Sequence, residues 1–442
     1  MSHTAATEIS NFQYYFAIAI FLITYAIIIS EKINRAVIAL FGAAVMIIFG
    51  IVDLHKAFTH HIEWGTITLL IGMMILVDIT SKSGFFQYMA IKAAKLAKGR
   101  PIRILVMLSS LTGILSAFLD NVTTVLLVVP VTFSITRMLQ VNPVPYLISE
   151  VLLSNIGGTA TLIGDPPNIM IGSANKHLDF NAFLLNLTPI VLLIAAVTIA
   201  LLAWIYRKQL KTDEKLISKL MNVNDADYIK DAKLLKKSVS ILTLTILGFI
   251  LHSAIHVDAA VIAMTGAVIL MLVAVPEHEI EDVFASVEWV TIFFFAGLFI
   301  LVGGLVDIGL IKSLAEKVLE ITGGDISVAA YFILWLSGIA SATIDNIPFV
   351  ATMIPLIKDM AVGMGLSPDA AQIEVLWWAL SLGACLGGNG TLIGASANVI
   401  VAGIASREGH GFSYMDFLKI GAPLTLIALL LSHAYLFVRY LM

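Results

Sequence analysis

Four apolar segments of the 442-residue chain contain the acidic and amide residues whose positions could support chemistry. Two of them carry an Asp-Asn pair, at 120–121 and at 345–346, near the centre of a long apolar run. The other two carry related sequences, GGTATLIGDPPN at 157–168 and GGNGTLIGASAN at 387–398. An ionised carboxylate at the centre of a bilayer costs at least about 2.5–3.5 kcal/mol, so it requires water, a cation or hydrogen-bond donors nearby. Carboxyl groups held in such a place are candidates for binding protons or cations.

We therefore expect the four segments to meet in one polar site inside the membrane. Asp120, Asp165 and Asp345 are the candidate proton carriers, and Asp165 has no counterpart in the second half, where Ala395 takes its place. An Asp-Asn pair can also cap a helix, and capping does not exclude contact with the site. The pattern predicts no metal site and no cofactor. The candidate ion- or substrate-binding residues are Asp120, Asn121, Thr161, Asp165, Asn168, Asp345, Asn346, Thr391 and Asn398.

The sequence GDPPN at 164–168 predicts a break in a membrane helix. Pro166 and Pro167 lack backbone N–H groups, and their rings clash with the preceding turn. The matching sequence GASAN at 394–398 has no proline, but its Gly, Ser and Asn residues also favour a break. Backbone polar groups that a break frees inside a bilayer must face protein or an aqueous cavity. We therefore expect two broken helices that direct their partial charges at a bound ion or polar solute.

The composition indicates a polytopic membrane protein that positions these segments. Hydrophobic residues make up 59% of the chain and charged residues only 13%, about half the charged share of a soluble domain. Apolar runs of about 17–25 residues, long enough to cross a hydrocarbon core, recur throughout. The first run, from Phe12 to Ser30, lacks a basic flank and a cleavage site, so we expect a retained helix rather than a signal peptide. The net charge is only −4, and no nucleic-acid partner is expected.

The two halves of the chain are related by an internal repeat. The sequence IEWGTITLLIGMMILV at 62–77 aligns with VEWVTIFFFAGLFILV at 287–302. The same offset of 225 residues joins the two Asp-Asn segments, whereas the two Gly-Gly segments match at an offset of 230 residues. Matched Asp-Asn pairs and matched Gly-Gly blocks are not expected from chance similarity between apolar segments.

The repeat and the distribution of lysines predict an all-α fold with two inverted-topology repeats, each of five transmembrane helices plus one re-entrant hairpin, with a broken helix in each half. The Lys-rich stretches 81–103 and 207–237 both belong in the cytoplasm by the positive-inside rule. Both stretches lie in the cytoplasm if segment 102–135 is a hairpin that enters and leaves the membrane on the same face. Each half then crosses the membrane five times, and because five is odd, the second half has the inverted orientation. The predicted organisation is an N-terminal repeat at 12–206 (hairpin 102–135, broken helix 146–175), a cytoplasmic linker at 207–237, and a C-terminal repeat at 238–440 (hairpin 326–360, broken helix 373–404).

Other notable residues have simpler structural explanations. Glu63 and Glu288 stand at helix starts and are expected to be interfacial caps. The Gly-Gly pairs at 157–158 and 387–388 are expected to allow close packing of helices. The single cysteine, Cys385, excludes a disulfide framework and is expected to be a small core residue.

At these motifs the sequence resembles the ion transporter superfamily, and within it the branch of arsenite permeases, NhaD sodium–proton antiporters and the melanosomal P protein. The resemblance covers residues 12–440 and is most specific at SAFLDNVTTVLLVVP, NIGGTATLIGDPPNIMIGSA, SATIDNIPFVATMIP and GGNGTLIGASANVIVAG. It implies hairpins and unwound helices around a central site, a homodimer formed through a scaffold domain, and a transport domain that moves as an elevator. Dicarboxylate transporters of the superfamily carry Ser-Asn-Thr at the hairpin tips. This chain has Asp-Asn-Val and Asp-Asn-Ile there, which argues against a dicarboxylate.

The lead hypothesis is a proton-coupled secondary transporter that exports arsenite or antimonite across a prokaryotic cell membrane. The four site segments contain three carboxylates and no Lys or Arg, so they suit a proton, a monovalent cation or neutral arsenous acid better than a dianion. Asp120 and Asp345 would couple to protons while asparagines hold the substrate. Sodium–proton antiport on the same carboxylates is the alternative, and an anion permease is a more distant one. An enzyme is not expected, and ATP hydrolysis would require a separate ATPase subunit.

Overall fold

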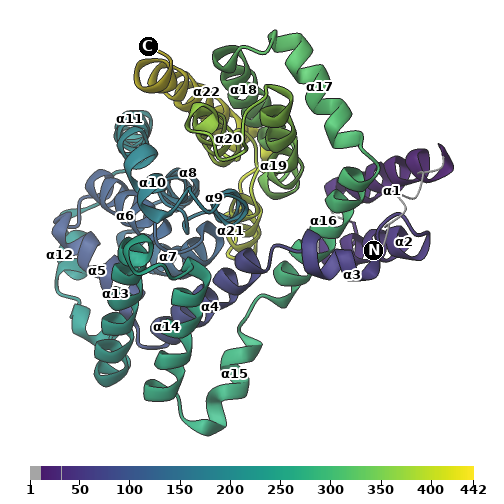
Figure 1. Ribbon diagram of the computed structural model, residues 1–442. Helices are drawn as coiled ribbons and strands as arrows, with labels where there is room; N and C mark the ends of the chain where they lie inside the picture. Colours follow the sequence, from purple (N-terminus) through teal and green to yellow (C-terminus); the bar gives the residue numbers. More distant parts are fainter. Residues whose placement is uncertain (1–10, 31) are drawn as a thin grey trace.

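The computed structural model describes residues 11–30 and 32–442, and all regular secondary structure in these residues is helical (Figure 1). Within this part of the chain, eight helices are long and apolar enough to cross a membrane, so the protein is an all-helical, polytopic membrane protein. These helices are α1 (Asn11–Ser30), α4 (Trp64–Lys82), α7 (Asn121–Leu139), α11 (Thr188–Tyr206), α13 (Ala232–Ile255), α16 (Trp289–Asp307), α18 (Ile326–Thr343) and α22 (Tyr414–Leu436).

Shorter helices complete the fold. Several of them are apolar and belong to segments that the sequence assigns to membrane crossings or hairpins, so the predicted number of crossings stays a prediction. The shorter helices are α2 (Arg35–Ile48), α3 (Leu54–Lys56), α5 (Phe85–Leu96), α6 (Pro101–Ser116), α8 (Val144–Gly158), α9 (Pro166–Ala174), α10 (Phe180–Asn186), α12 (Glu214–Met221), α14 (Ala259–Ala274), α15 (Ile280–Ala285), α17 (Leu310–Thr322), α20 (Glu374–Gly387) and α21 (Ser396–Arg407). Helix α19 (Asn346–Gly363) is as long as α18 but is not among the eight candidate spans.

Matching pairs of helices pack together in the two halves of the chain. Helix α6 packs on α8 in the first half as α18 packs on α20 in the second, and α4 packs on α14 as α16 packs on α2. Figure 1 shows α9 and α21 near the centre of the molecule, between the helices of the two halves. The internal repeat of the sequence is therefore accompanied by repeated packing.

The closest helix contacts depend on glycine. A Cβ atom on Gly157 would lie 2.1 Å from the carbonyl oxygen of Gly113, and one on Gly387 would lie 2.5 Å from that of Gly338. Both distances are far shorter than a van der Waals contact, so α6 and α8, and likewise α18 and α20, can approach this closely only without side chains. The helix-packing role predicted for these Gly-Gly pairs is confirmed for Gly157 and Gly387, whereas Gly158 and Gly388 face the non-helical segments that follow them.

Two interruptions separate successive helices at the centre of the fold. Helix α8 ends at Gly158 and α9 begins at Pro166, while α20 ends at Gly387 and α21 begins at Ser396. Pro166 and Pro167 do not lie within the first interruption but open α9. Proline suits the first turn of a helix because its missing N–H group has no intrahelical acceptor there.

The Lys-rich linker segment is partly helical and contacts α5. The ammonium group of Lys95 donates hydrogen bonds to the carbonyl oxygen of Val223 at 2.9 Å and to Oδ1 of Asp225 at 3.0 Å. The hydrogen bond from Lys95 holds the pKa of the Asp225 carboxyl below its ordinary value. These contacts attach the linker to the surface of the first half.

Candidate functional site

A small cavity lies where the four candidate segments meet. Its volume is about 30 Å³, which is room for two or three water-sized groups at most, since a water needs roughly 10–15 Å³. Three carboxylates and one guanidinium group contribute to its wall, from Asp120, Asp165, Glu288 and Arg35. We call it the central cavity. Its remaining polar lining comes from Asn121, Thr291, Asn346 and Ser396.

Asp120 and Asp345 reach the site because each occupies the N-cap position of a helix. Oδ1 of Asp120 accepts a hydrogen bond from the backbone N–H of Thr123 at 2.9 Å, and its Oδ2 accepts one from the Thr123 hydroxyl. Oδ1 of Asp345 accepts from the N–H of Ile347 at 3.2 Å. Both aspartates therefore cap a helix, as the sequence allows. Capping leaves Oδ2 of Asp345 for the groups described below.

Asp165 is the most deeply enclosed of the three aspartates. It precedes α9 at the N-cap position, yet its side chain makes no capping bond, and it is fully buried. Oδ1 of Asp165 accepts a long hydrogen bond of 3.4 Å from Nδ2 of Asn346. Among the described residues its Oδ2 makes no hydrogen bond of ordinary geometry, although the thiol of the buried Cys385 lies close enough to interact with this carboxyl group. A buried carboxylate oxygen without such a bond is costly, so this oxygen has free capacity for a proton or a cation.

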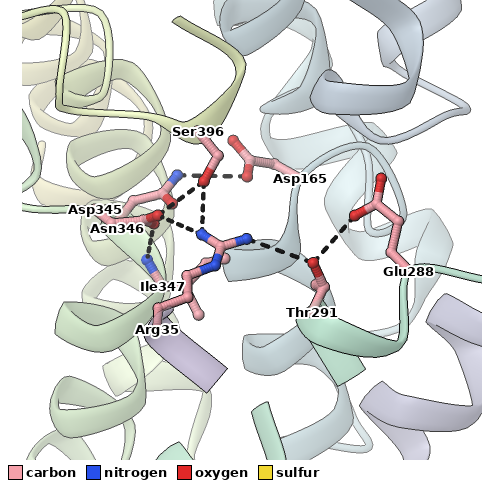
Figure 2. Close-up of polar contacts among 8 residues, drawn as sticks. All are labelled: Arg35, Asp165, Glu288, Thr291, Asp345, Asn346, Ile347 and Ser396. Carbon is pink, nitrogen blue, oxygen red and sulfur yellow. Dashed lines mark hydrogen bonds and ion pairs between the residues drawn. The ribbon is translucent and has the colours of Figure 1, made fainter. Parts of the chain in front are cut away.

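Arg35, the first residue of α2, places a guanidinium group beside the aspartates (Figure 2). Its Nη1 lies 3.1 Å from Oδ2 of Asp345 and donates to Oγ of Ser396 at 2.8 Å. Its Nη2 donates to Oγ1 of Thr291 at 3.4 Å. The hydroxyl of Ser396 in turn donates to Oδ2 of Asp345 at 2.9 Å. Arg35 was not predicted from the sequence because it lies far along the chain from the four segments.

Glu288 also belongs to the site, and its predicted role as an interfacial cap is wrong. It stands at the N-cap position of α16, but its side chain makes no capping bond to the backbone. Its Oε2 instead accepts from the hydroxyl of Thr291 at 3.0 Å, and the residue lines the central cavity (Figure 2). Glu63, its counterpart at the start of α4, likewise makes no side-chain capping bond.

A chain of buried amides joins the segments behind the cavity. Nδ2 of Asn121 donates to Oδ1 of Asn155 at 2.9 Å. Nδ2 of Asn155 donates to Oδ1 of Asn389 at 2.8 Å and to Oδ1 of Asn398 at 2.9 Å. Asn155 thus connects α7 and α8 of the first half with the interruption and α21 of the second half. Asn155 was not predicted as a site residue, and its counterpart at the offset of 230 residues is Cys385.

The predicted site residues Asn168 and Asn398 support the two interruptions. Nδ2 of Asn168 donates to the carbonyl oxygen of Thr161 at 2.8 Å, and Nδ2 of Asn398 donates to that of Thr391 at 2.9 Å. Oδ1 of Asn168 accepts from the Ser381 hydroxyl at 2.5 Å. These equivalent bonds close each non-helical segment onto the start of the following helix.

The two predicted threonines have equivalent bonds as well. The hydroxyl of Thr161 donates to the carbonyl oxygen of Ala117, and that of Thr391 donates to the carbonyl oxygen of Ala342 at 2.5 Å. Each bond ties an interruption to the end of the helix before an Asp-Asn pair. Cys385 is fully buried, and the core position predicted for it is confirmed; its Sγ lies 3.6 Å from Oδ1 of Asn168.

The structure therefore divides the nine predicted site residues into two sets. The first set lines the central cavity or an adjoining one: Asp120, Asn121, Asp165, Asp345 and Asn346. The second set donates to backbone carbonyl oxygens in or next to the interruptions and is not found among the described residues that line the central cavity: Thr161, Asn168, Thr391 and Asn398.

Two larger cavities lie beside equivalent helix turns. One, of about 320 Å³, is lined by the α1–α2 turn, the start of α21 and Asp345, and it shares Arg35 and Ser396 with the central cavity. The other, of about 510 Å³, is lined by the α13–α14 turn and by α9, and it shares no residue with the central cavity. We call them the α1–α2 cavity and the α13–α14 cavity. Of these two cavities, only the α1–α2 cavity adjoins the central cavity and its charged groups.

The known proteins that this chain resembles are described mainly as transporters. The model of the family described as citrate transporter, CitMHS, matches residues 25–383. An uncharacterized transporter of Mycobacterium tuberculosis strain H37Rv is 42% identical over 427 residues, which cover 96% of this chain and 98% of that protein. The 46 kDa membrane protein of Mycobacterium leprae is 42% identical over 428 residues, with the same coverage of both chains.

The human P protein is 35% identical over 523 residues, and the match covers 100% of this chain and 62% of the P protein. The resemblance to the P-protein branch that the motifs indicate is therefore confirmed. Among solved structures, the YdaH transporter of Alcanivorax borkumensis is similar, with a TM-score of 0.59 and 15% identity, covering 96% of this chain and 98% of that chain. This likeness concerns the fold.

Proposed function

This chain belongs to the CitMHS family of secondary transporters and is not an enzyme, and we propose that it exchanges protons for a small cation, Na⁺ in the first place. The observation that carries the proposal is the central cavity of about 30 Å³, whose wall holds three carboxylates and one guanidinium group. With all of these groups ionised, the cavity has an excess of negative charge, which attracts cations and repels anions. Its volume suits a single dehydrated ion better than a polyatomic solute.

The proposed coupling groups are the aspartates, Asp165 first and Asp120 and Asp345 with it. Among the described residues, Oδ2 of Asp165 makes no hydrogen bond of ordinary geometry, so either a proton or Na⁺ can complete its coordination. The two ligands exclude each other because a protonated carboxyl group binds a hard cation poorly. Mutually exclusive binding at one carboxylate is the simplest route from a proton gradient to cation export.

Export of arsenite or antimonite, the function that the sequence favours first, takes second place in this proposal. That hypothesis needs amide and hydroxyl groups to bind the As–OH groups. Asn168, Asn398, Thr161 and Thr391 direct their donors at backbone carbonyl oxygens instead. The uncharged polar residues on the wall of the central cavity, on which an uncharged solute would depend, are Asn121, Thr291, Asn346 and Ser396.

Proton-coupled transport of a small carboxylate is a further candidate because of Arg35. The α1–α2 cavity, of about 320 Å³, is large enough for a tricarboxylate and carries the Arg35 guanidinium group on its wall. The matched family is described as citrate transporter. Protonation of Asp345 would release Arg35 to bind a substrate carboxylate as a bidentate partner. The carboxylates around the central cavity oppose this reading, so we rank it below cation exchange.

The proposal includes the topology and movement that the sequence predicts. Two inverted repeats of five crossings and one hairpin would place the α1–α2 turn and the linker in the cytoplasm of a prokaryotic cell, so the α1–α2 cavity would open inward. A homodimer with an elevator movement of the central helices would then alternate access. The equivalent packing of α6 on α8 and α18 on α20 supports this two-fold plan.

Proton flux in proteoliposomes tests the proposal. Purified protein is reconstituted with a pH-sensitive dye inside, and Na⁺, arsenite, antimonite or citrate is added outside under an imposed pH gradient. We expect Na⁺ to discharge the gradient, and Asp165→Asn and Asp345→Asn to abolish this response. Asp282→Asn, at an exposed position on α15, is the matched control and should behave as wild type. A response to arsenite or citrate but not to Na⁺ would show that cation exchange is the wrong function.

A further inference from the structure

Arg35 occupies a position that the helix itself does not favour. It is the first residue of α2, where the positive end of the helix dipole repels a cation. Its guanidinium carbon also lies 4.9 Å from the ring centroid of Phe294, which adds a cation–π contact. The side chain is therefore held by its partners in the site and not by its own helix.

The partners of Arg35 include a carboxylate oxygen that a transported cation would need. Nη1 of Arg35 and Oγ of Ser396 both donate to Oδ2 of Asp345, while Oδ1 of Asp345 is engaged by the backbone of α19. Oδ2 of Asp345 is thus already paired with the positively charged guanidinium group of Arg35. A metal cation could bind Oδ2 of Asp345 in place of the guanidinium group only after that group had moved away.

We propose that Arg35 is a tethered internal cation, which occupies Asp345 in the unloaded carrier and which the transported cation must displace. This inference rests on the proposed cation exchange and deepens it, because it names the residue that sets the affinity for the cation. Displacement needs no other chemistry than an exchange of one positive charge for another. The α1–α2 cavity offers space for the released side chain, since Arg35 already forms part of its wall.

The same contact links two parts of the molecule. Arg35 belongs to α2, which packs on α16, whereas Asp345 and Ser396 begin α19 and α21. An ion pair between these parts opposes their relative movement until a cation or a proton neutralises Asp345. In the unloaded carrier the two parts would therefore not move relative to each other. This would suppress conformational change without a bound cation or proton, and so prevent an uncoupled leak of cations.

The test compares Arg35→Gln with Arg35→Lys in the proteoliposome assay. Without the competing charge, R35Q should lower the apparent KM for Na⁺ about tenfold, where each tenfold corresponds to 1.4 kcal/mol. R35K keeps a cation within reach and should stay within about twofold of wild type. Arg137→Gln is the matched control, since Arg137 forms an exposed ion pair with Glu408 and does not line the central cavity in the described structure. A role in folding alone would not lower KM.

A second variant allows the same comparison to be made if R35Q folds poorly. Arg35→Cys can be modified on the folded protein with aminoethyl methanethiosulfonate, which restores a cation, or with methyl methanethiosulfonate, which does not. Cys385 is fully buried and should give little background. The cationic adduct should raise the KM for Na⁺ relative to the neutral adduct.

The outcomes separate the two proposals. A KM that is unchanged or raised in R35Q, or equal for the two adducts, would overturn the role of Arg35 while leaving cation exchange intact. If wild-type protein moves no protons in response to Na⁺, the proposed function fails, and the role of Arg35 as competitor of a transported cation fails with it.

Discussion

Substitution of Asn155 by alanine should destabilise the protein more than the loss of one amide suggests. Asn155 is fully buried, and its side chain makes three hydrogen bonds, to Asn121, Asn389 and Asn398. Alanine leaves each of these partners with one buried polar atom short of a bond. At about 1–3 kcal/mol for each such atom, the expected loss is about 3–9 kcal/mol. A water admitted to the vacated space would bring the value toward the lower limit.

Equilibrium unfolding in mixed detergent–SDS micelles measures this loss. The matched control is Asn222→Ala, the same chemical change at an exposed position after α12, which should alter the free energy of unfolding by less than about 0.5 kcal/mol. Asn155→Asp keeps the shape and the acceptor for Asn121 but cannot donate to Asn389 and Asn398, so it should also be destabilising. A loss for N155A below about 1 kcal/mol would refute the conclusion that this amide connects the two halves.

Three other predictions follow from particular contacts. Gly157→Ala should destabilise by at least about 1–3 kcal/mol, because its Cβ would lie 2.1 Å from a carbonyl oxygen, whereas Gly403→Ala, with open space around it, should be nearly neutral in the same unfolding assay. Asp165→Asn should retain folding, since it keeps the shape of a buried residue, but should lose Na⁺-driven proton flux, and normal flux would remove Asp165 from the coupling mechanism. Because Lys95 lowers the pKa of Asp225, their contact stabilises the linker fully above the ordinary aspartate pKa of about 3.9, and this stabilisation is lost as the pH falls through the lowered pKa. Hydrogen exchange at residues 223–228 should therefore be slower in wild type than in Lys95→Gln at pH 6, and this difference should shrink as the pH is lowered below about 3.9.

The class of protein and the pairing of its halves could both be predicted from the amino-acid sequence. Long apolar runs have few alternatives to membrane helices, because only internally bonded helices satisfy the backbone in lipid. The Gly-Gly contacts and the capping positions of Asp120 and Asp345 depend on residues close in sequence or related by the repeat, so they too could be predicted. The family resemblance depended on the same local motifs.

The set of polar groups that share the central cavity depends on how distant helices pack, and it could not be predicted from the sequence. Arg35 and Glu288 lie on α2 and at the start of α16, and neither belongs to the repeated motifs that carry the aspartates. Conversely, Asn168 and Asn398 lie within those motifs but direct their amides at nearby carbonyl oxygens. Whether a polar side chain serves its own backbone or a shared cavity depends on the packing of distant helices, and hydropathy and spacing along one chain do not contain that information.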